Sequence, residues 1–485
     1  MSAALFDGHV AWSSSDLAAA VQAARSQLQA SGTGVLATVL DNGPAFVVLD
    51  EAARAAGVVH VPLPLFFTPA QMQHALQAAG VDTVLTTGEW AARMAGLPWS
   101  AVTLAGLPLM QLRLPAAPVA LPAGTVKITF TSGTTGTPKG VCLGGPALDA
   151  VAAGLVQALA PLGLQRHLSA LPYAVLLENI AGLMAPRAHG STIVALPLAQ
   201  IGLTGSSAFD VAMFHRAVLQ QQADSVILLP QMLRAWVGLL QLTGQRAPAC
   251  LKLVAVGGAA VGAPLVLAAQ ALGIPVAEGY GLSEGASVQT LNLPNAPQAP
   301  QANRPGSAGR LLPHAQMRVA DDGELLIAGS LFSGYLGDPA PVPTWWPTGD
   351  LGHIDADGFV HLQGRKKNLL ITGYGRNVSP EWVETALRCQ PAVGQAVVFG
   401  DAQPALSAVL WSVRPDADDT ALQAAVDAAN ATLPDYARIA RWVRGRAAFD
   451  TASGLATANG RPQRPAIWQA HADALNHALD PLTPV

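Results

Sequence analysis

Hydrophobic and polar positions along the first ninety residues alternate between helical spacing and strand-like runs. Ser13–Ser15 precede an apolar-periodic segment that stops near Gly32, which predicts a helix with an N-cap and a glycine stop. Thr68-Pro69-Ala70-Gln71 forms a capping box with proline at the first helical position, and it opens another helix. Between them the pattern predicts a strand over residues 34–40, a helix over 45–57 and a strand over 58–64. This order predicts a parallel sheet covered by helices.

The pattern changes further along the chain. Residues 145–280 resume the alternation of strands and helices, whereas residues 306–364 hold short elements punctuated by glycine with Asp or Asn, which predicts antiparallel hairpins. Residues 365–485 mix helices with two strands and predict a small α+β domain. We therefore expect an α/β protein with an N-terminal domain over residues 1–364 and a C-terminal domain over residues 365–485.

The uncharged stretch Leu253–Ala277 raises the question of a membrane span. Its glycines and prolines interrupt any single apolar helix, so it predicts a buried strand, a helix and a second buried strand. The N-terminal segment MSAALFDGHV lacks a basic region and carries Asp7, so we expect no signal peptide. The sequence thus predicts a protein without a transmembrane span.

Composition narrows the classes of function. Hydrophobic residues make up 51% of the chain, charged residues 12%, and the net charge is −4, which argues against both disorder and a nucleic-acid-binding face. Cys142, Cys250 and Cys389 are widely spread, as is typical of reduced thiols in the cytoplasm. The 11 histidines show no metal-ligand spacing, so no structural metal is expected. Only five of the 27 basic residues are lysines, so any lysine that chemistry requires must be one of these five.

The densest chemical signal is residues 130–140, FTSGTTGTPKG, which carry five hydroxyls, three glycines and Lys139. Glycines let backbone N–H groups converge on an anion, hydroxyls add donors, and the lysine supplies a positive charge. A strand-like sequence, TVKITF, runs directly into the segment, which argues against a flexible linker. A Walker P-loop is excluded because the chain has no Gly-Lys dipeptide. The segment predicts a phosphate-binding loop.

This loop resembles that of the adenylate-forming superfamily, which includes acyl- and aryl-CoA synthetases, adenylation domains and luciferases. Segments similar to other family motifs follow in the same order, namely Tyr280–Glu284, residues 304–313, Thr348–Asp350 and residues 364–384. LPYAVLLENIAG, residues 171–182, is similar to the fatty-acyl-CoA ligase branch. The resemblance implies a large N-terminal domain of parallel and mixed sheets with a small antiparallel barrel-like part, followed by a small mobile C-terminal lid.

The resemblance also implies two half-reactions. A carboxylate attacks the α-phosphate of ATP, giving an acyl-adenylate and pyrophosphate, and a thiol, usually that of coenzyme A, then takes the acyl group. Glu284 would hold Mg²⁺, a hard cation suited to one carboxylate plus phosphate oxygens, and Ser283 would bond the α-phosphate. The other implied ATP and AMP ligands are Thr131, Ser132, Gly133, Thr134, Thr135, Gly136, Lys139, Gly258, Ala259, Tyr280, Gly281, Asp350 and Arg365.

The chain departs from the family in its lid. The family's last motif has a lysine that acts in adenylation, but here Arg461 stands at that position and no lysine lies beyond Lys367. Arginine keeps the positive charge but is planar and differently hydrated, which leaves three outcomes: retained activity, slow adenylation, or an enzyme that accepts preformed adenylate. Lys367 matches the hinge of the lid. The residues that resemble the thiol-tunnel loop are Gly373, Tyr374 and Gly375.

The sequence says less about the acid. Val175 stands where the fatty-acyl branch has histidine, and it is expected in the acyl pocket with Gly257. A hydrophobic, fatty acid is therefore expected, with coenzyme A or a carrier-protein phosphopantetheine as acceptor. Two other classes stay open. Gly281–Gly285 also satisfies the GxSxG elbow of α/β-hydrolases, with Ser283 as nucleophile and Asp350 and His353 or His361 downstream. Arg461 would also suit a non-catalytic adenylate-binding protein.

Overall fold

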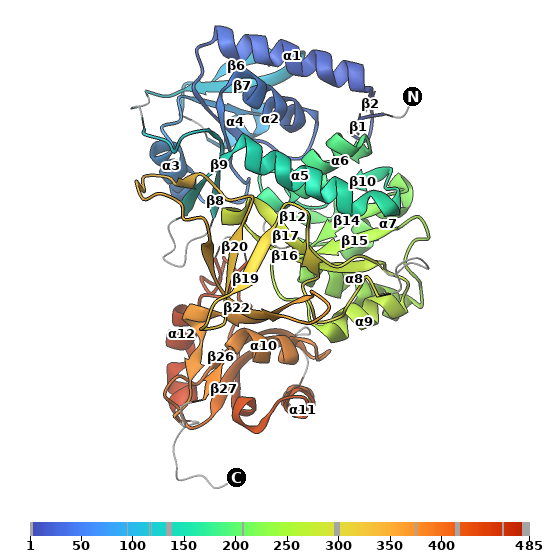
Figure 1. The fold of residues 1–485 in the computed structure, drawn as a ribbon, viewed down its shortest axis with the longest axis vertical. Coiled ribbons are helices and arrows are strands. Elements are labelled where there is room, and N and C mark those ends of the chain that lie inside the picture. The colour runs from blue at the N-terminus through green and yellow to red at the C-terminus, as the bar shows by residue number, and fades with distance from the viewer. Residues whose placement is uncertain are drawn as a thin grey trace.

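The computed structural model describes residues 3–94, 96–115, 117, 119–131, 138–205, 208–294, 301–373, 376–412, 418–457 and 460–477. Two large sheets and an antiparallel sheet make up the N-terminal part, and a smaller domain follows at the C-terminus (Figure 1). The first sheet lies at one end of the molecule and the C-terminal domain at the other (Figure 1). The mixed α/β fold with a small C-terminal domain is confirmed.

The first large sheet carries the β-α-β units that the sequence predicts. Its strands, in spatial order, are β21 (Gly334–Tyr335), β9 (Lys139–Gly144), β8 (Thr125–Thr131), β4 (Val59–Pro62), β3 (Val35–Val39), β5 (Thr83–Thr86), β7 (Leu107–Arg113) and β6 (Ser100–Leu104). β8, β4, β3 and β5 run parallel, and the flanking strands pair antiparallel. The helices of this region are α1 (Ser14–Ala30), α2 (Pro44–Ala56), α3 (Pro69–Ala78) and α4 (Gly88–Arg93). The predicted caps at Ser13 and Thr68 are confirmed.

The second large sheet is parallel through its centre. Its strands, in spatial order, are β18 (Arg310–Leu311), β17 (Ser287–Leu291), β16 (Val276–Leu282), β15 (Leu253–Val256), β14 (Ser225–Leu228), β10 (Arg166–Leu168), β11 (Thr192–Val194), β1 (Leu5–Phe6) and β2 (Ala11–Trp12). Its helices are α7 (Val211–Gln221), α8 (Pro230–Thr243) and α9 (Ala263–Ala271), and β12 (Leu203–Thr204) pairs with β13 (Ala208–Phe209). Residues 253–277 thus form strand, helix and strand, as predicted.

A helical layer packs between the two large sheets. It contains α5 (Gly145–Leu159), the π-helix η2 (Glu178–Met184) and α6 (Ala185–His189), whose apolar residues share one core cluster with β9 and β15. Within the described residues, Gly145–Leu162 is the one helical stretch long and apolar enough to cross a membrane by length and composition. Leu148, Val151 and Leu155 of this stretch are buried in that core cluster.

The remaining strands form smaller units. β19 (Gln316–Val319), β20 (Glu324–Ala328), β22 (Trp346–Ile354) and β23 (Val360–Arg365) make the predicted antiparallel sheet. The C-terminal domain holds the sheet β26 (Val393–Phe399), β27 (Leu406–Ser412) and β28 (Ile439–Arg444), the hairpin β24 (Leu370–Ile371) and β25 (Asn377–Val378), and helices α10 (Pro380–Arg388), α11 (Asp419–Asn430) and α12 (Arg464–His477). The proposed boundary near Gly364 lies at the end of β23 and stays a prediction.

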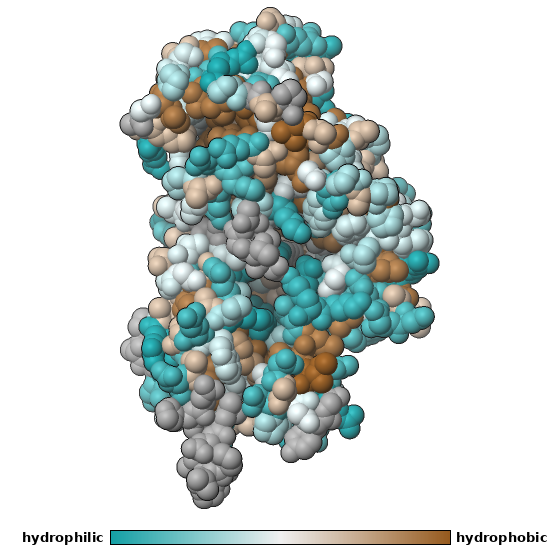
Figure 2. Space-filling model, turned by 90° about the vertical axis from the view of Figure 1, so that its left-hand side faces the viewer, coloured by the Kyte–Doolittle hydropathy of each residue, from teal (hydrophilic) through white to brown (hydrophobic). Residues whose placement is uncertain are grey.

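Many of the hydrophobic residues are buried in the interior. Six hydrophobic clusters fill the spaces between sheets and helices, and two of them belong to the C-terminal domain. On the face shown in Figure 2, hydrophobic residues gather in patches, most densely at the upper end, which the N-terminal sheet forms.

Candidate active site

A cavity of about 1430 Å³ lies between the N-terminal part and the C-terminal domain. Its wall includes residues at the carboxyl ends of β15 and β16, residues of β8, β9, β22 and β23, and residues of α10 in the C-terminal domain. Ligands of open α/β sheets bind beyond the carboxyl ends of the strands. The position of the cavity is therefore that of a binding site.

Asp350 is the centre of a polar cluster on the cavity wall. Asp350 on β22 is a register partner of Arg365 on β23, and its carboxylate pairs with Arg365 Nε at 2.8 Å. The same carboxylate accepts a hydrogen bond of 2.7 Å from the Tyr280 hydroxyl. Burial raises the pKa of Asp350, although Arg365 and the Tyr280 hydrogen bond oppose this shift. Three residues that are far apart in sequence thus form one hydrogen-bonded unit that lines the cavity.

Glu284 and Lys139 both lie near Tyr335, another residue of the cavity wall. Glu284 is in the 3-10 turn η4 (Ser283–Gly285), and it accepts a hydrogen bond of 2.7 Å from the Tyr335 hydroxyl. Lys139 Nζ is 5.3 Å from the centroid of the Tyr335 ring. Thr131, the last residue of β8, and Ser283 line the cavity with them. The wall therefore presents an ammonium and two hydroxyls that suit a bound anion, and a carboxylate that suits a cation.

The backbone at the end of β16 requires glycine. The pairing of β16 with β17 shifts register between Tyr280 and Gly281. A Cβ placed on Gly281 would overlap the carbonyl oxygen of Ser287 on the neighbouring strand. Ala286 and Ser287 follow with φ of +55° and +110°, which non-glycine residues seldom adopt. Such irregular pairing re-aims the residues that follow it, here Ser283 and Glu284.

A buried carboxyl group that the sequence analysis did not single out lies on the same wall. Glu278 on β16 accepts a hydrogen bond of 3.2 Å from the Val261 N–H through Oε1, and Oε2 has no partner among the described residues. Burial raises the pKa of Glu278 to about 7. The signal in the sequence is an acidic residue that directly follows the apolar run IPVA. The predicted residues Gly257, Gly258 and Ala259, after β15, line the cavity with it.

The C-terminal domain contributes positive charge to the cavity. Arg461 and Lys367 both line it. Desolvation and the charge of Arg365 lower the pKa of the Arg461 guanidinium, whereas Asp350 and Glu284 oppose this shift. Desolvation, Arg365 and Arg461 lower the pKa of Lys367. Because these groups influence one another, Arg461 lies within electrostatic reach of the Asp350 cluster.

Several predicted residues lie outside the described part of the structure, and one described residue lies off the cavity wall. Ser132, Gly133, Thr134, Thr135 and Gly136 of the loop, and Tyr374 and Gly375 of the thiol-tunnel segment, lie outside the described residues. Gly373 is described, but it is not part of the cavity wall, and its N–H donates to the Gln403 carbonyl at 2.7 Å. The thiol-tunnel role stays a prediction.

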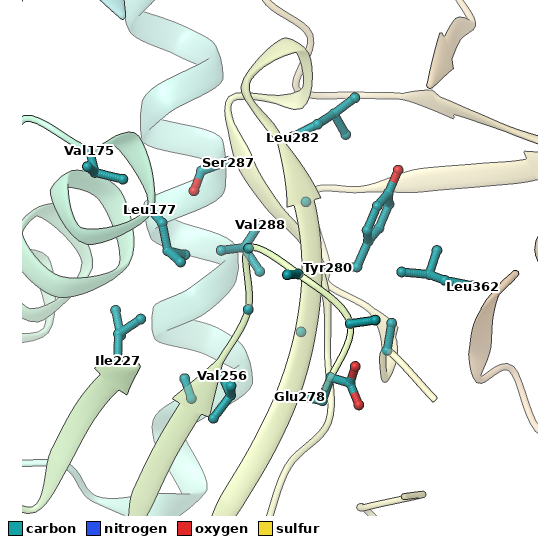
Figure 3. Close-up of a pocket in the computed structure, with 18 of the residues that line it drawn as sticks. Val175, Leu177, Ile227, Val256, Glu278, Tyr280, Leu282, Ser287, Val288 and Leu362 are labelled. Atoms are coloured by element: carbon teal, nitrogen blue, oxygen red, sulfur yellow. The ribbon is translucent and has the colours of Figure 1, made fainter. Parts of the chain in front are cut away.

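An apolar branch leads away from the polar part of the cavity. Figure 3 shows Val175, Leu177 and Ile227 together on one side, with Tyr280 and Leu362 on the other. Val175 and Leu177 come from the segment just before η2, whereas Ile227 comes from β14 of the second sheet. The branch therefore runs between the helical layer and the second sheet. Its other apolar lining residues are Leu155, Val156, Leu159, Ala181, Leu253, Ala255 and Val288.

A second buried cluster that the sequence analysis missed braces the helical layer. Lys127 on β8 donates to Asp50 on α2 and to Asn179 on η2, and Asp50 also pairs with His60 Nδ1 at 2.7 Å. His60 Nε2 is 2.8 Å from the Thr38 hydroxyl. Lys127 and His60 hold the pKa of Asp50 well below its usual range in spite of burial. One of the five lysines thus joins the first sheet to the π-helix.

The comparisons with known proteins agree with this geometry. The AMP-binding enzyme family matches residues 2–336, and the AMP-binding enzyme C-terminal domain matches residues 367–481. The chain belongs to the AMP-binding enzyme family. Long-chain-fatty-acid–CoA ligase FadD15 of Mycobacterium bovis is 38% identical over 187 residues, 37% of this AMP-binding enzyme and 30% of the relative. The 2-succinylbenzoate–CoA ligase of Bacillus cereus is 30% identical over 301 residues, 56% of each protein. The chain spans less than two thirds of either relative.

A solved structure shares the fold of this AMP-binding enzyme. The o-succinylbenzoate coenzyme A synthetase MenE of Bacillus subtilis, in complex with ATP and a magnesium ion, superposes with a TM-score of 0.76 over 96% of each chain, at 22% sequence identity.

The described residues do not form the triad that a serine hydrolase needs. His361 Nε2 contacts Asp355 at 2.9 Å, and its ring stacks on His353 with 4.7 Å between centroids. Neither histidine lines the cavity that contains Ser283. Asp350 pairs with Tyr280 and Arg365 instead of a histidine. The arrangement of these residues therefore does not support the hydrolase alternative.

Proposed function

We propose that this AMP-binding enzyme activates a hydrophobic carboxylic acid with ATP and transfers the acyl group to coenzyme A, releasing pyrophosphate and AMP. The observation that carries the proposal is one cavity in which the Asp350–Arg365 pair, Glu284 and Arg461 meet the entrance of an apolar branch. A charged part suits the nucleotide and an apolar part suits the acid. The relatives named above are themselves CoA ligases.

The Asp350 cluster supports binding of the nucleoside. The two oxygens of Asp350 are held by Tyr280 and Arg365, and each retains a lone pair that accepts a ribose hydroxyl. Glu278 Oε2, which has no partner among the described residues, is available to accept an N–H from the adenine amine. Gly257 and Gly258 let a flat base approach the backbone closely.

Glu284 fits Mg²⁺. This hard cation is bound by one or two carboxylates together with substrate phosphate oxygens, and the Tyr335 hydrogen bond orients the Glu284 carboxylate in the cavity. When bound, Mg²⁺ neutralises charge on the phosphates. Lys139 adds a fixed positive charge on the same wall.

Arg461 supports the adenylation step. This step brings a carboxylate and a phosphate together, so positive charge fixed at the reacting atoms lowers the barrier. Arg461 lies within electrostatic reach of the Asp350 cluster, and its guanidinium suits oxyanions such as carboxylate and phosphate. We assign Arg461 the role that a lysine has elsewhere in the family, which makes this chain a catalyst and not only an adenylate-binding protein.

The apolar branch supports a fatty acid. It runs beneath the helical layer along the length of β15, which suits an extended chain better than a single ring. We further place the enzyme in the cytoplasm, where its free thiols Cys142, Cys250 and Cys389 stay reduced.

The test incubates the full chain with ATP, Mg²⁺ and a panel of fatty and aromatic carboxylates, with and without coenzyme A. Acid-dependent exchange between ATP and pyrophosphate is expected without coenzyme A, and acyl-CoA with AMP is expected when it is added. No acid-dependent exchange with any acid would contradict the proposal. Release of AMP only with a carrier protein would reassign the acceptor. An Asp350→Asn variant serves as the control, because it keeps the shape of the side chain but loses its charge.

A further inference from the structure

The far end of the apolar branch is polar. Its floor consists of three adjacent strands, on which His167, Ser225 and Leu253 are register partners and form one row across the sheet. Ile227 and Ala255 form the row nearer the nucleotide part of the cavity, and all five residues line the cavity. An acyl chain that extends from the nucleotide part of the cavity thus passes an apolar row first, and the next row contains a histidine and a serine.

The two polar side chains belong to a buried chain of hydrogen bonds. His167 Nδ1 lies 3.1 Å from the Ser225 hydroxyl, and His167 Nε2 lies 3.1 Å from Glu178 Oε1. All three residues are buried, and Glu178 is fully inaccessible. Glu178 therefore fixes the imidazole ring, and the ring holds Ser225 at the surface of the branch.

The fold makes room for this arrangement. Glu178 begins the π-helix η2, a type of helix often found at functional sites. One turn on, a Cβ at Gly182 would overlap Glu178 Oε1 and lie 2.8 Å from His167 Nε2, so only glycine fits. Asn179, which follows Glu178 in the sequence, accepts a hydrogen bond from the buried Lys127. Three separate features thus keep Glu178 and His167 in place.

A purely hydrocarbon tail would leave polar atoms at this end of the branch without a hydrogen-bond partner from the substrate. Such a tail would cover polar atoms without replacing the hydrogen bonds of the water that it displaces, which is unfavourable. The Ser225 hydroxyl uses one hydrogen bond on His167 and retains a further donor or acceptor site, depending on which partner carries the proton. A substrate hydroxyl matches both states because it donates and accepts.

The strand geometry gives the depth of this polar row. Leu253 in the polar row lies four positions before Gly257, which is near the nucleotide part of the cavity. Four residue steps of strand span about 13 Å, which is the length of roughly ten methylene groups of an extended chain that rises about 1.3 Å per carbon.

We propose that the acid substrate carries a hydroxyl group near the far end of a medium-length chain, bound by Ser225 beside His167. This inference rests on the proposed function and names the class of its acid. Ser225 and His167 select the substrate at a distance from the reacting carboxylate.

The test compares decanoate with 10-hydroxydecanoate on the full chain in two measurements. Calorimetry with AMP present gives the affinity for each acid, and AMP release with ATP and coenzyme A gives kcat/KM. We expect the hydroxy acid to be favoured about five- to tenfold in both, the value of one hydrogen bond. Ser225→Ala should abolish the preference and Ser225→Thr should keep it. Ile227→Val, which changes only apolar contacts, should affect both acids equally.

The outcomes separate the inference from the proposed function. Decanoate bound as tightly as the hydroxy acid, or a preference that survives Ser225→Ala, would overturn the inference even if both acids yield AMP. A Ser225-dependent binding preference with no AMP from any acid would support the polar site and refute the ligase activity.

Discussion

Replacing Arg461 tests the most unusual feature of this cavity. Arg461 is a lid residue that lines the cavity within electrostatic reach of Asp350 and Glu284, and the described residues make no hydrogen bond to its guanidinium. Its donors are therefore available to the substrates. Arg461→Ala removes the charge and all these donors, whereas Arg461→Lys keeps the positive charge on a shorter side chain.

The size of the effect follows from the kind of contact. A hydrogen bond to a charged group contributes about 1.5–3 kcal/mol. If the guanidinium makes one such bond in the transition state, its loss slows adenylation by about 10- to 150-fold. A donor aimed at developing charge has effects of about 10²–10³ in kcat. The two ranges overlap near a hundredfold, so we expect Arg461→Ala to reduce kcat about a hundredfold and Arg461→Lys to preserve or raise it.

The assay is ATP–pyrophosphate exchange in the presence of the acid, followed by transfer from a preformed acyl-adenylate to coenzyme A. Only the exchange should fall, because the second step does not join two anions. Arg446→Ala, at an exposed arginine of the C-terminal domain outside the cavity wall, is the matched control. Full exchange activity in Arg461→Ala would refute the assignment.

Three further predictions concern single positions. Glu278→Gln should stabilise the protein by about 3 kcal/mol at pH 8 but not near pH 4.5. The pKa of Glu278 is raised to about 7, so the native state keeps a proton that the unfolded state loses, and stability falls as pH rises through this range. Urea unfolding at both pH values checks this, and an unchanged pH dependence would contradict it. Gly281→Ala should cost about 1–3 kcal/mol and most activity, because its Cβ overlaps the Ser287 carbonyl. Gly238→Ala, in open space on α8, should be neutral or stabilising in thermal unfolding, and equal effects would refute the steric argument. Tyr335→Phe frees Glu284 and should raise the Mg²⁺ concentration for half-maximal exchange several-fold, with the KM of the acid unchanged.

Local pattern predicted much of the fold because its causes are local. The Ser13 and Thr68 caps satisfy N–H groups within one turn, so they can be recognised from neighbouring residues. The strand–helix–strand of Leu253–Ala277 follows from its prolines and glycines. The motif residues Tyr280, Asp350 and Arg365 were found because their order along the chain resembles a family.

Other features of the site depend on contacts between distant segments. Glu278, Lys127 and the His167–Ser225 pair were missed because each gains its meaning from a partner on another strand or helix. The sequence by itself determined the class of fold, the order of the motifs and the absence of a lysine from the lid. Only the tertiary structure decided that Arg461 lies within electrostatic reach of Asp350, that Glu278 is buried with an oxygen that has no partner among the described residues, and that the acyl branch ends in a polar row. Burial and register are set by strands that meet only after folding, and no single segment encodes them.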